Sequence, residues 1–304
     1  MATLQEQAQA PDRAVAARPA LTPLRRAWRF LWSNWKLPLG LALVLGLLLF
    51  GALGRLFVSE ADLKLGVGPY SKPPSAAFPF GTDSNGRNLF AQMVYGLPTT
   101  LQIGLIAATV GTVIGTFLGL ATGYYRGPVD TVVRSVSDIM MTIPSLMILV
   151  VIASFVSTTV QVMAIIIAAF AWPWSVRSVR AQTLSMREQA FVRLSKLSGR
   201  SDLEIILLDL LPNLLPYIIA GFVGAVNGAI LASVGLQLLG LGSLDEPTVG
   251  LVLHYSFESA AILRGMWWWW LPPTVVLAIL FVGLFLISIA LDEIANPRLR
   301  GVGQ

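Results

Sequence analysis

The sequence predicts an all-α polytopic integral membrane protein with six transmembrane helices. Hydrophobic residues make up 55% of the 304-residue chain and charged residues only 12%, whereas charged residues form about 25% of a soluble domain. The mean hydropathy is +0.73, and six stretches are apolar over about the 20 residues that a spanning helix needs. With one histidine and no cysteine, the chain offers neither a multi-histidine metal site nor a disulfide framework.

The chain begins with a segment that differs from these apolar stretches. Residues 1–36 contain acids and prolines and lack the early apolar core of a signal peptide, so we expect a cytosolic tail. Trp28, Trp32 and Trp35 fall at i, i+4 and i+7 beside arginines, a pattern typical of a short helix that lies in the membrane interface.

The first spanning helix is expected over 37–57, followed by an extracytoplasmic loop over 58–96. A five-helix core is expected over 97–300, before a short C-terminal tail, 301–304. Its helices are expected at 97–124, at 132–156 with a break at Pro144, at 160–174 with a polar continuation to 186, at 214–241 and at 267–291. The first of these five has glycines at about four-residue spacing, which let helices approach closely in lipid.

The distribution of Lys and Arg predicts the orientation of the chain. Sixteen of them fall on the side that holds both termini, and five fall on the other side. Because cytosolic loops carry the excess of Lys and Arg, both termini are expected in the cytosol. The cations lie between apolar spans, so membrane orientation explains the net charge of +5 better than nucleic-acid binding does, and we expect membrane lipid as a partner but no nucleic acid.

A polar segment, residues 187–211, interrupts the apolar pattern on the cytosolic side. Its first half predicts an amphipathic helix of about three turns, with an apolar stripe (Ala190, Phe191, Leu194, Leu197) opposite a basic one (Arg193, Lys196, Arg200). Gly199 can adopt the left-handed conformation that ends a helix, and Ser201 with Glu204 forms a capping box that opens a second short helix. The segment is either a solvated connector or, because of its apolar stripe, a helix that fits a groove in another protein.

These residues resemble the coupling loop, or EAA region, of permease subunits of bacterial ABC importers. Four collinear stretches are similar to the dipeptide, oligopeptide and nickel class of that family. They are "FGTDSNGRN" (80–88), "SDIMMTIPSLMI" (137–148), "WPWSVRSVRAQTLSMREQAFV" (172–192) and "LQLLGLG" (236–242). In two of them the chain departs from the family pattern, with Asn88 in place of an aspartate, and Gln237 and Leu238 in place of a serine and a phenylalanine.

The resemblance implies a type I importer permease fold and a non-catalytic, pore-forming subunit in a bacterial plasma membrane. It implies three kinds of protein partner: a second, homologous permease, one or two cytosolic ABC ATPases, and an extracytoplasmic solute-binding protein. The chain lacks the G-x-x-x-x-G-K-[ST] phosphate loop, so it is expected to bind no cofactor, with ATP and Mg on the ATPase subunits. Short peptides are the expected cargo, with nickel chelates and oligosaccharides as alternatives.

The resemblance also assigns candidate site residues. Contact with the ATPase is expected at Glu188, Ala190, Phe191, Arg193, Leu194, Leu197, Gly199, Ser201 and Asp202. An outer motif is formed by Gly81, Thr82, Asp83, Gly86 and Arg87, either as a turn in which Arg87 pairs with Asp83 or as a docking or gating element.

Polar residues elsewhere left alternatives open. Asn227 and Gln237 either line the pore or bond a neighbouring helix. Asp138 is either functional or paired with Arg134, and His254 is expected to be a solvated residue of an outer loop.

Two rival classes of protein were weighed against the importer subunit. A membrane serine protease would need a better-placed general base than this lone histidine, and the chain has no G-x-S-x-G stretch. A stand-alone channel or secondary transporter would show internal repeats or intramembrane charge pairs.

Overall fold

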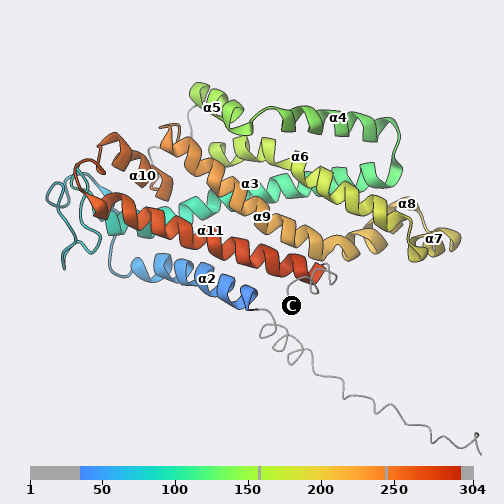
Figure 1. Cartoon of the computed structure of the whole chain (residues 1–304), viewed down its shortest axis with the longest axis horizontal. Helices are drawn as coiled ribbons and strands as arrows, with labels where there is room; N and C mark the ends of the chain where they lie inside the picture. The colour runs from blue at the N-terminus through green and yellow to red at the C-terminus, as the bar shows by residue number, and fades with distance from the viewer. Residues whose placement is uncertain (1–34, 157–158, 244–245, 296–304) are drawn as a thin grey trace, which may run out of the picture. The chain divides into compact units, whose positions relative to one another are not determined.

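The computed structural model describes residues 35–156, 159–243 and 246–295, of which Lys36 onward belong to one compact unit. The long apolar segments of this unit are all helices (Figure 1), which confirms the predicted fold class. The helices are α2 (Lys36–Gly54), α3 (Leu89–Tyr125), α4 (Pro128–Thr142), α5 (Ser145–Phe155), α6 (Val160–Arg187), α7 (Ala190–Leu197), α8 (Asp202–Glu204), α9 (Leu211–Leu238), α10 (Val249–Glu258) and α11 (Trp267–Ala295). Of the predicted interfacial helix, Trp28 and Trp32 lie outside the described residues.

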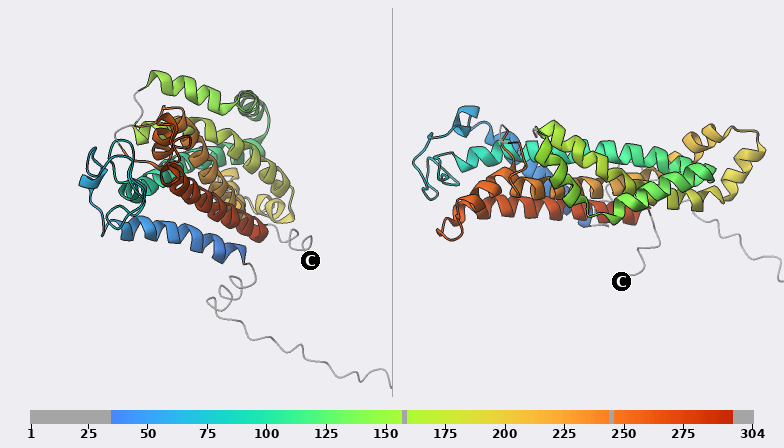
Figure 2. Two further views of the ribbon diagram at one scale, coloured as in Figure 1. Left: turned by 60° about the vertical axis from the view of Figure 1, so that its left-hand side comes forward. Right: turned by 90° about the horizontal axis from the view of Figure 1, so that it is seen from above.

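Six spans are present if a bent pair of helices counts as one. Five helices of the described chain are long and apolar enough to cross a membrane, and α4 with α5 forms the bent pair, at 83°. The break lies at the predicted Pro144, because a proline disfavours the α conformation of the residue before it, and Ile143 is extended. Figure 2 shows α4 and α5 running in different directions along one side of the bundle.

The α3–α6 interface carries most of the predicted glycine stripe. Of the four predicted glycines, Gly104 faces Ile230 of α9 instead, and Gly123 extends the stripe by one turn. Gly111, Gly115, Gly119 and Gly123 face α6 so closely that a Cβ atom on any of them would lie 2.2–2.9 Å from a Cβ atom of α6. Such spacing holds the two backbones in direct contact, and these two helices therefore form one tightly packed pair.

Helix α3 begins at Leu89, eight residues before the predicted start. The Asn88 side chain caps it by accepting from the backbone N–H groups of Phe90 and Ala91 at 3.1 and 3.4 Å. The prediction placed the start near Pro98, but this proline lies inside the helix, where packing compensates the lost hydrogen bond. Asparagine and aspartate are equally good N-caps, so the departure at Asn88 preserves this structural role.

Two further expectations about the helices were wrong. The second short helix of the polar segment is not separate from the next span, because α8, a π-helical segment η2 (Ile205–Leu210) and α9 form one continuous helix from Asp202 to Leu238. The stretch around His254 is not a solvated loop but helix α10. It packs against α9 and α11, and its Thr248 N-cap accepts from the Leu251 N–H at 3.1 Å.

Candidate functional site

The polar segment projects at the end of the bundle that we call the α7 end (Figures 1 and 2). Gly199 has φ of +81°, the left-handed conformation that was predicted. The Ser201 hydroxyl accepts from the Glu204 N–H at 3.4 Å, and the Glu204 carboxylate accepts from the Ser201 N–H at 2.8 Å, so the predicted capping box is present. The glycine and the capping box together turn the chain back from α7 into α8.

Helix α7 is shorter than predicted, with eight residues, and presents its apolar stripe outward. Phe191, Leu194 and Leu197 are 38%, 65% and 86% exposed, and Ala190 is also exposed. The prediction overlooked Val192, which is 2% exposed and anchors α7 in an apolar cluster with Leu210 and Leu214. No other part of the described chain, therefore, covers the stripe.

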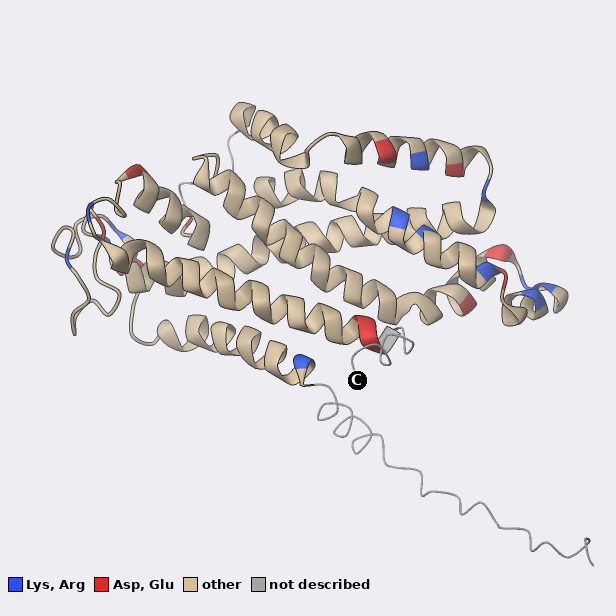
Figure 3. Ribbon diagram, in the orientation of Figure 1, with Lys and Arg blue, Asp and Glu red and all other residues tan. Residues whose placement is uncertain are grey.

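The charged residues of the polar segment form mostly exposed ion pairs. The Glu188 carboxylate lies 3.4 Å from the Arg126 guanidinium and 3.7 Å from that of Arg193. Asp202 accepts from the Tyr124 hydroxyl at 2.6 Å, a contact that pattern analysis could not find because the two residues are 78 positions apart. Figure 3 shows charge at the two ends of the bundle and along α4 and the second half of α6, with the middle of α9 and α11 uncharged.

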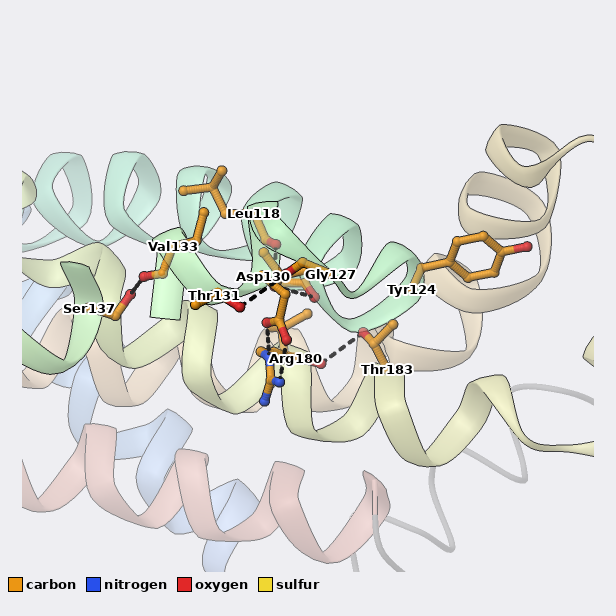
Figure 4. Close-up of polar contacts among 12 residues, drawn as sticks. Leu118, Tyr124, Gly127, Asp130, Thr131, Val133, Ser137, Arg180 and Thr183 are labelled. Atoms are coloured by element: carbon orange, nitrogen blue, oxygen red, sulfur yellow. Dashed lines mark hydrogen bonds and ion pairs between the residues drawn. The ribbon is translucent and has the colours of Figure 1, made fainter. Parts of the chain in front are cut away.

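A second missed contact joins α4 to α6. Arg180 donates two hydrogen bonds to Asp130, at 2.5 and 2.7 Å, in the side-by-side geometry seen in Figure 4. Bidentate pairs of this kind are the stronger charge-assisted hydrogen bonds. The predicted pair of Arg134 with Asp138 does not occur among the described residues, and Asp130 is the aspartate that holds α4 on the bundle.

A cavity of about 1040 Å³ lies along α6 and α9. Its wall combines small residues of α9 (Ala220, Gly221, Gly224, Ala225, Gly228, Ala229, Ala232) with hydroxyl and amide groups (Ser145, Ser175, Ser178, Gln182, Ser185, Asn213, Tyr217, Ser288). Among the described residues that line it, Asp292 alone carries a charge. The wall also contains large apolar side chains (Leu149, Ile167, Phe170, Trp174, Met186 and Leu214), so the cavity offers a solute apolar surface as well as neutral hydrogen-bonding groups.

Neither residue predicted to line the pore lies on this cavity. Gln237 is 1% exposed, and its amide oxygen accepts from the Thr248 hydroxyl at 2.5 Å, so it serves the alternative role of bonding a neighbouring helix. Asn227 is half-buried, with no partner for its Oδ1 atom among the described residues. Gln237 lies away from the cavity because α9 is buried against α10 at this position, and α10 is a helix that the sequence did not reveal.

The outer motif lies at the opposite end, where it forms the predicted turn. Asp83 accepts from the backbone N–H groups of Asn85 and Arg87, both at 2.8 Å, and its carboxylate lies 3.3 Å from the Arg87 guanidinium. Burial raises the pKa of the Asp83 carboxyl above its ordinary value, although these hydrogen bonds and Arg87 act in the opposite direction. Gly81 and Gly86 both have φ of +73°, which explains glycine at these positions.

This turn also holds neighbouring elements together. Thr82 is fully buried, and its carbonyl accepts from the Trp268 indole N–H at 3.3 Å. The Arg87 guanidinium lies over the Tyr255 ring of α10, 4.2 Å from its centroid. Trp269 is 1% exposed and packs in an apolar cluster with Leu89 and Met266. His254, far from solvated, lies 3.2 Å from the Leu238 carbonyl and 3.7 Å from Glu258.

The fold and the site together define a membrane permease with a protruding apolar helix at one end. The description "Binding-protein-dependent transport system inner membrane component" belongs to the family that matches residues 89–301. The chain belongs to this family, the permease subunits of ABC importers, as the sequence predicted.

Individual relatives and one solved structure agree with this assignment. The chain is 33% identical to the dipeptide transport system permease protein DppC of Alkalihalophilus pseudofirmus over 74% of each chain. It is 27% identical to DppC of Bacillus subtilis over 93% of this chain and 88% of that one. The inward-facing MetNI methionine ABC transporter has the same fold, with a TM-score of 0.53, 20% identity, and coverage of 66% of this chain and 94% of that one.

Proposed function

We propose that this chain is one half of the pore of an ATP-driven importer of short peptides, and that α7 is the helix that docks in the ATPase. The exposed apolar stripe on α7 carries the proposal. A helix that leaves Leu194 and Leu197 uncovered at a charged, polar end of the bundle buries that surface in a protein groove. Each such leucine contributes about 1.5–3 kcal/mol when it is fully buried.

The orientation follows from the same segment. The α7 end faces the cytosol, where the ATPases are, and both termini lie on that side, in agreement with the excess of Lys and Arg there. The outer motif and α10 then face the solute-binding protein. ATP and Mg bind only to the partner ATPases, and the membrane is the bacterial plasma membrane.

The cargo is inferred from the cavity and from the relatives. Relatives of this chain are named as permease proteins of dipeptide, glutathione and oligopeptide transport systems. The hydroxyl and amide groups of the wall suit peptide bonds, which both donate and accept hydrogen bonds, and its apolar side chains suit the side chains of a peptide. A second copy of the fold, from a homologous permease, closes the open side of the cavity.

A matched pair of leucine substitutions tests the docking surface. Leu197→Asp places a charge on the α7 stripe, and Leu263→Asp places one on a leucine of similar exposure, 90% against 86%, at the opposite end. The tagged variants are extracted from native membranes in mild detergent, and the co-purifying proteins and their ATPase activity are measured with loaded binding protein.

Leu197→Asp should lose the ATPase subunits and the stimulated hydrolysis, because a buried charge without a partner opposes docking. Leu263→Asp should retain the ATPase subunits. Equal recovery of the ATPase subunits with both variants would mean that the stripe is not the docking surface. A wild-type chain that purifies without partner subunits would contradict the importer proposal itself.

A further inference from the structure

Three parts of the polar segment converge on one buried side chain, Tyr124, in the last turn of α3. The residue is 3% exposed. Its hydroxyl donates to Asp202 Oδ1 at 2.6 Å, and Asp202 is the first residue of α8. The Lys196 ammonium of α7 lies 5.3 Å from the centre of the Tyr124 ring and 3.9 Å from the same Asp202 oxygen.

The end of α6 also contacts Tyr124. Arg187 donates a hydrogen bond to the Tyr124 carbonyl, and its guanidinium carbon lies 5.7 Å from the ring centre. The ring is part of the apolar cluster that holds Val192 of α7 and Ile205 of η2. Tyr124 is therefore the place where the protruding helices meet the transmembrane bundle.

We propose that the Tyr124 hydroxyl, through Asp202, carries movement of the α7–α8 segment into the α3–α6 helix pair. This inference rests on the proposed docking of α7 in an ATPase. It adds the contacts through which a movement of α7 displaces the helices that line the cavity. Tyr124 acts as a positioning residue, because it fixes α8 relative to α3 without touching cargo.

The packing of α3 explains why movement at Tyr124 reaches the cavity. Just before it, Gly123 faces Thr183 of α6, and a Cβ atom on Gly123 would lie 2.6 Å from the Thr183 Cβ. With no slack between the helices, α6 moves with α3, and α6 contributes Ser175, Ser178 and Gln182 to the cavity wall. Packed elements transmit displacement because interiors deform little.

The backbone offers a second route, from α8 through η2 into α9, and this route contains a π-helical segment. Such segments interrupt the regular hydrogen-bonding ladder and occur at functional sites. The Tyr124 contact makes α3 and α6 move together with α9, so that both walls of the cavity respond to α7.

The test uses two neighbouring tyrosines. Tyr124→Phe removes only the hydroxyl, and Tyr125→Phe is the matched control, because Tyr125 is 55% exposed and its ring packs against Tyr124 at a centroid distance of 5.2 Å. Both variants are assembled with the wild-type partner subunits in proteoliposomes. Peptide uptake and ATP hydrolysis are measured in the same sample.

Tyr124→Phe should keep the ATPase subunits bound and ATP hydrolysis active, but uptake per ATP should fall roughly tenfold, the factor expected for one hydrogen bond to a charged group. Tyr125→Phe should match the wild type. An unchanged ratio of uptake to hydrolysis in Tyr124→Phe would overturn the proposal.

Asp202 provides an independent variant if Tyr124→Phe assembles poorly. Its side chain is 46% exposed, so Asp202→Ala is compatible with folding and should lower uptake per ATP to the same extent. Asp202→Asn keeps an oxygen that accepts from Tyr124 and should retain most coupling. In a double-mutant cycle, Tyr124→Phe with Asp202→Ala should be no worse than either single variant, and additive losses would contradict a shared contact.

These outcomes separate the inference from the proposed function. If wild-type complexes show no hydrolysis linked to uptake, the importer proposal fails. If the wild type is coupled and Tyr124→Phe is equally coupled, only the Tyr124 route fails.

Discussion

Replacing Gly115 by alanine should destabilise the chain, because Gly115 lies at the closest approach of α3 and α6. A Cβ atom at this position would lie 2.2 Å from the Ser175 Cβ and 2.9 Å from the Trp172 carbonyl oxygen. The first distance is about 1.2 Å below the 3.4 Å at which ordinary van der Waals contact begins. Neither neighbour is the flexible end of a side chain, so the helices themselves must separate.

The expected cost follows from this geometry. Overpacking a well-packed interface typically costs about 1–3 kcal/mol, and we expect the upper part of that range because separation also loosens the contacts of Gly111 and Gly119. Gly46→Ala is the control, since no atom lies within 4 Å of a Cβ atom at Gly46 in α2. Alanine there should be neutral or stabilising by roughly 0.5–1 kcal/mol, because glycine is the weaker helix former.

The assay is unfolding of the purified variants in one detergent, followed by circular dichroism during titration with a denaturing detergent. Gly115→Ala should unfold at a lower denaturant fraction than the wild type, and Gly46→Ala should not. If the two variants unfold at the same point, the close packing of α3 against α6 is wrong.

Substitutions at three further contacts test them individually, with stability measured by thermal unfolding. Asp83→Ala removes the acceptor of two backbone N–H groups and should cost about 1–3 kcal/mol, whereas Asp83→Asn should cost less. Because the pKa of Asp83 is raised in the folded state, the wild type should lose stability relative to Asp83→Asn as the pH rises from below the ordinary value of 3.8 through the raised pKa. Asn88→Ala should cost about 1 kcal/mol through loss of the α3 cap, and Asn88→Asp should not. Asp130→Ala should lower the free energy of unfolding by roughly 1.5–3 kcal/mol. The double exchange Asp130→Arg with Arg180→Asp should restore part of this loss. If it restores none, the pair does not hold α4 on the bundle.

Local features of this fold were predictable because they depend on neighbouring residues. The apolar stretches, the break at Pro144, the left-handed Gly199 and the capping box at Ser201 each follow from a few consecutive positions. The Asp83 and Arg87 pair is four positions apart and belongs to the same class.

Features that depend on distant contacts were not predictable. Tyr124 with Asp202, and Asp130 with Arg180, join positions 78 and 50 residues apart, and nothing in a single sequence marks such partners. Helix α10 was missed because its ten residues are too few for a span and follow a polar stretch. The partner of Gln237 was missed with it, since the Thr248 hydroxyl from which Gln237 accepts a hydrogen bond belongs to the cap of α10.

The central claim is tested most directly by ATP-driven uptake of a labelled dipeptide. Proteoliposomes contain this chain with its second permease and ATPase subunits, ATP is enclosed in the lumen, and loaded binding protein is added outside. We predict accumulation of the peptide that requires enclosed ATP, the binding protein and all subunits, and that is lost in Leu197→Asp. Peptide flux through this chain alone, without ATP or partners, would contradict the account and indicate a channel.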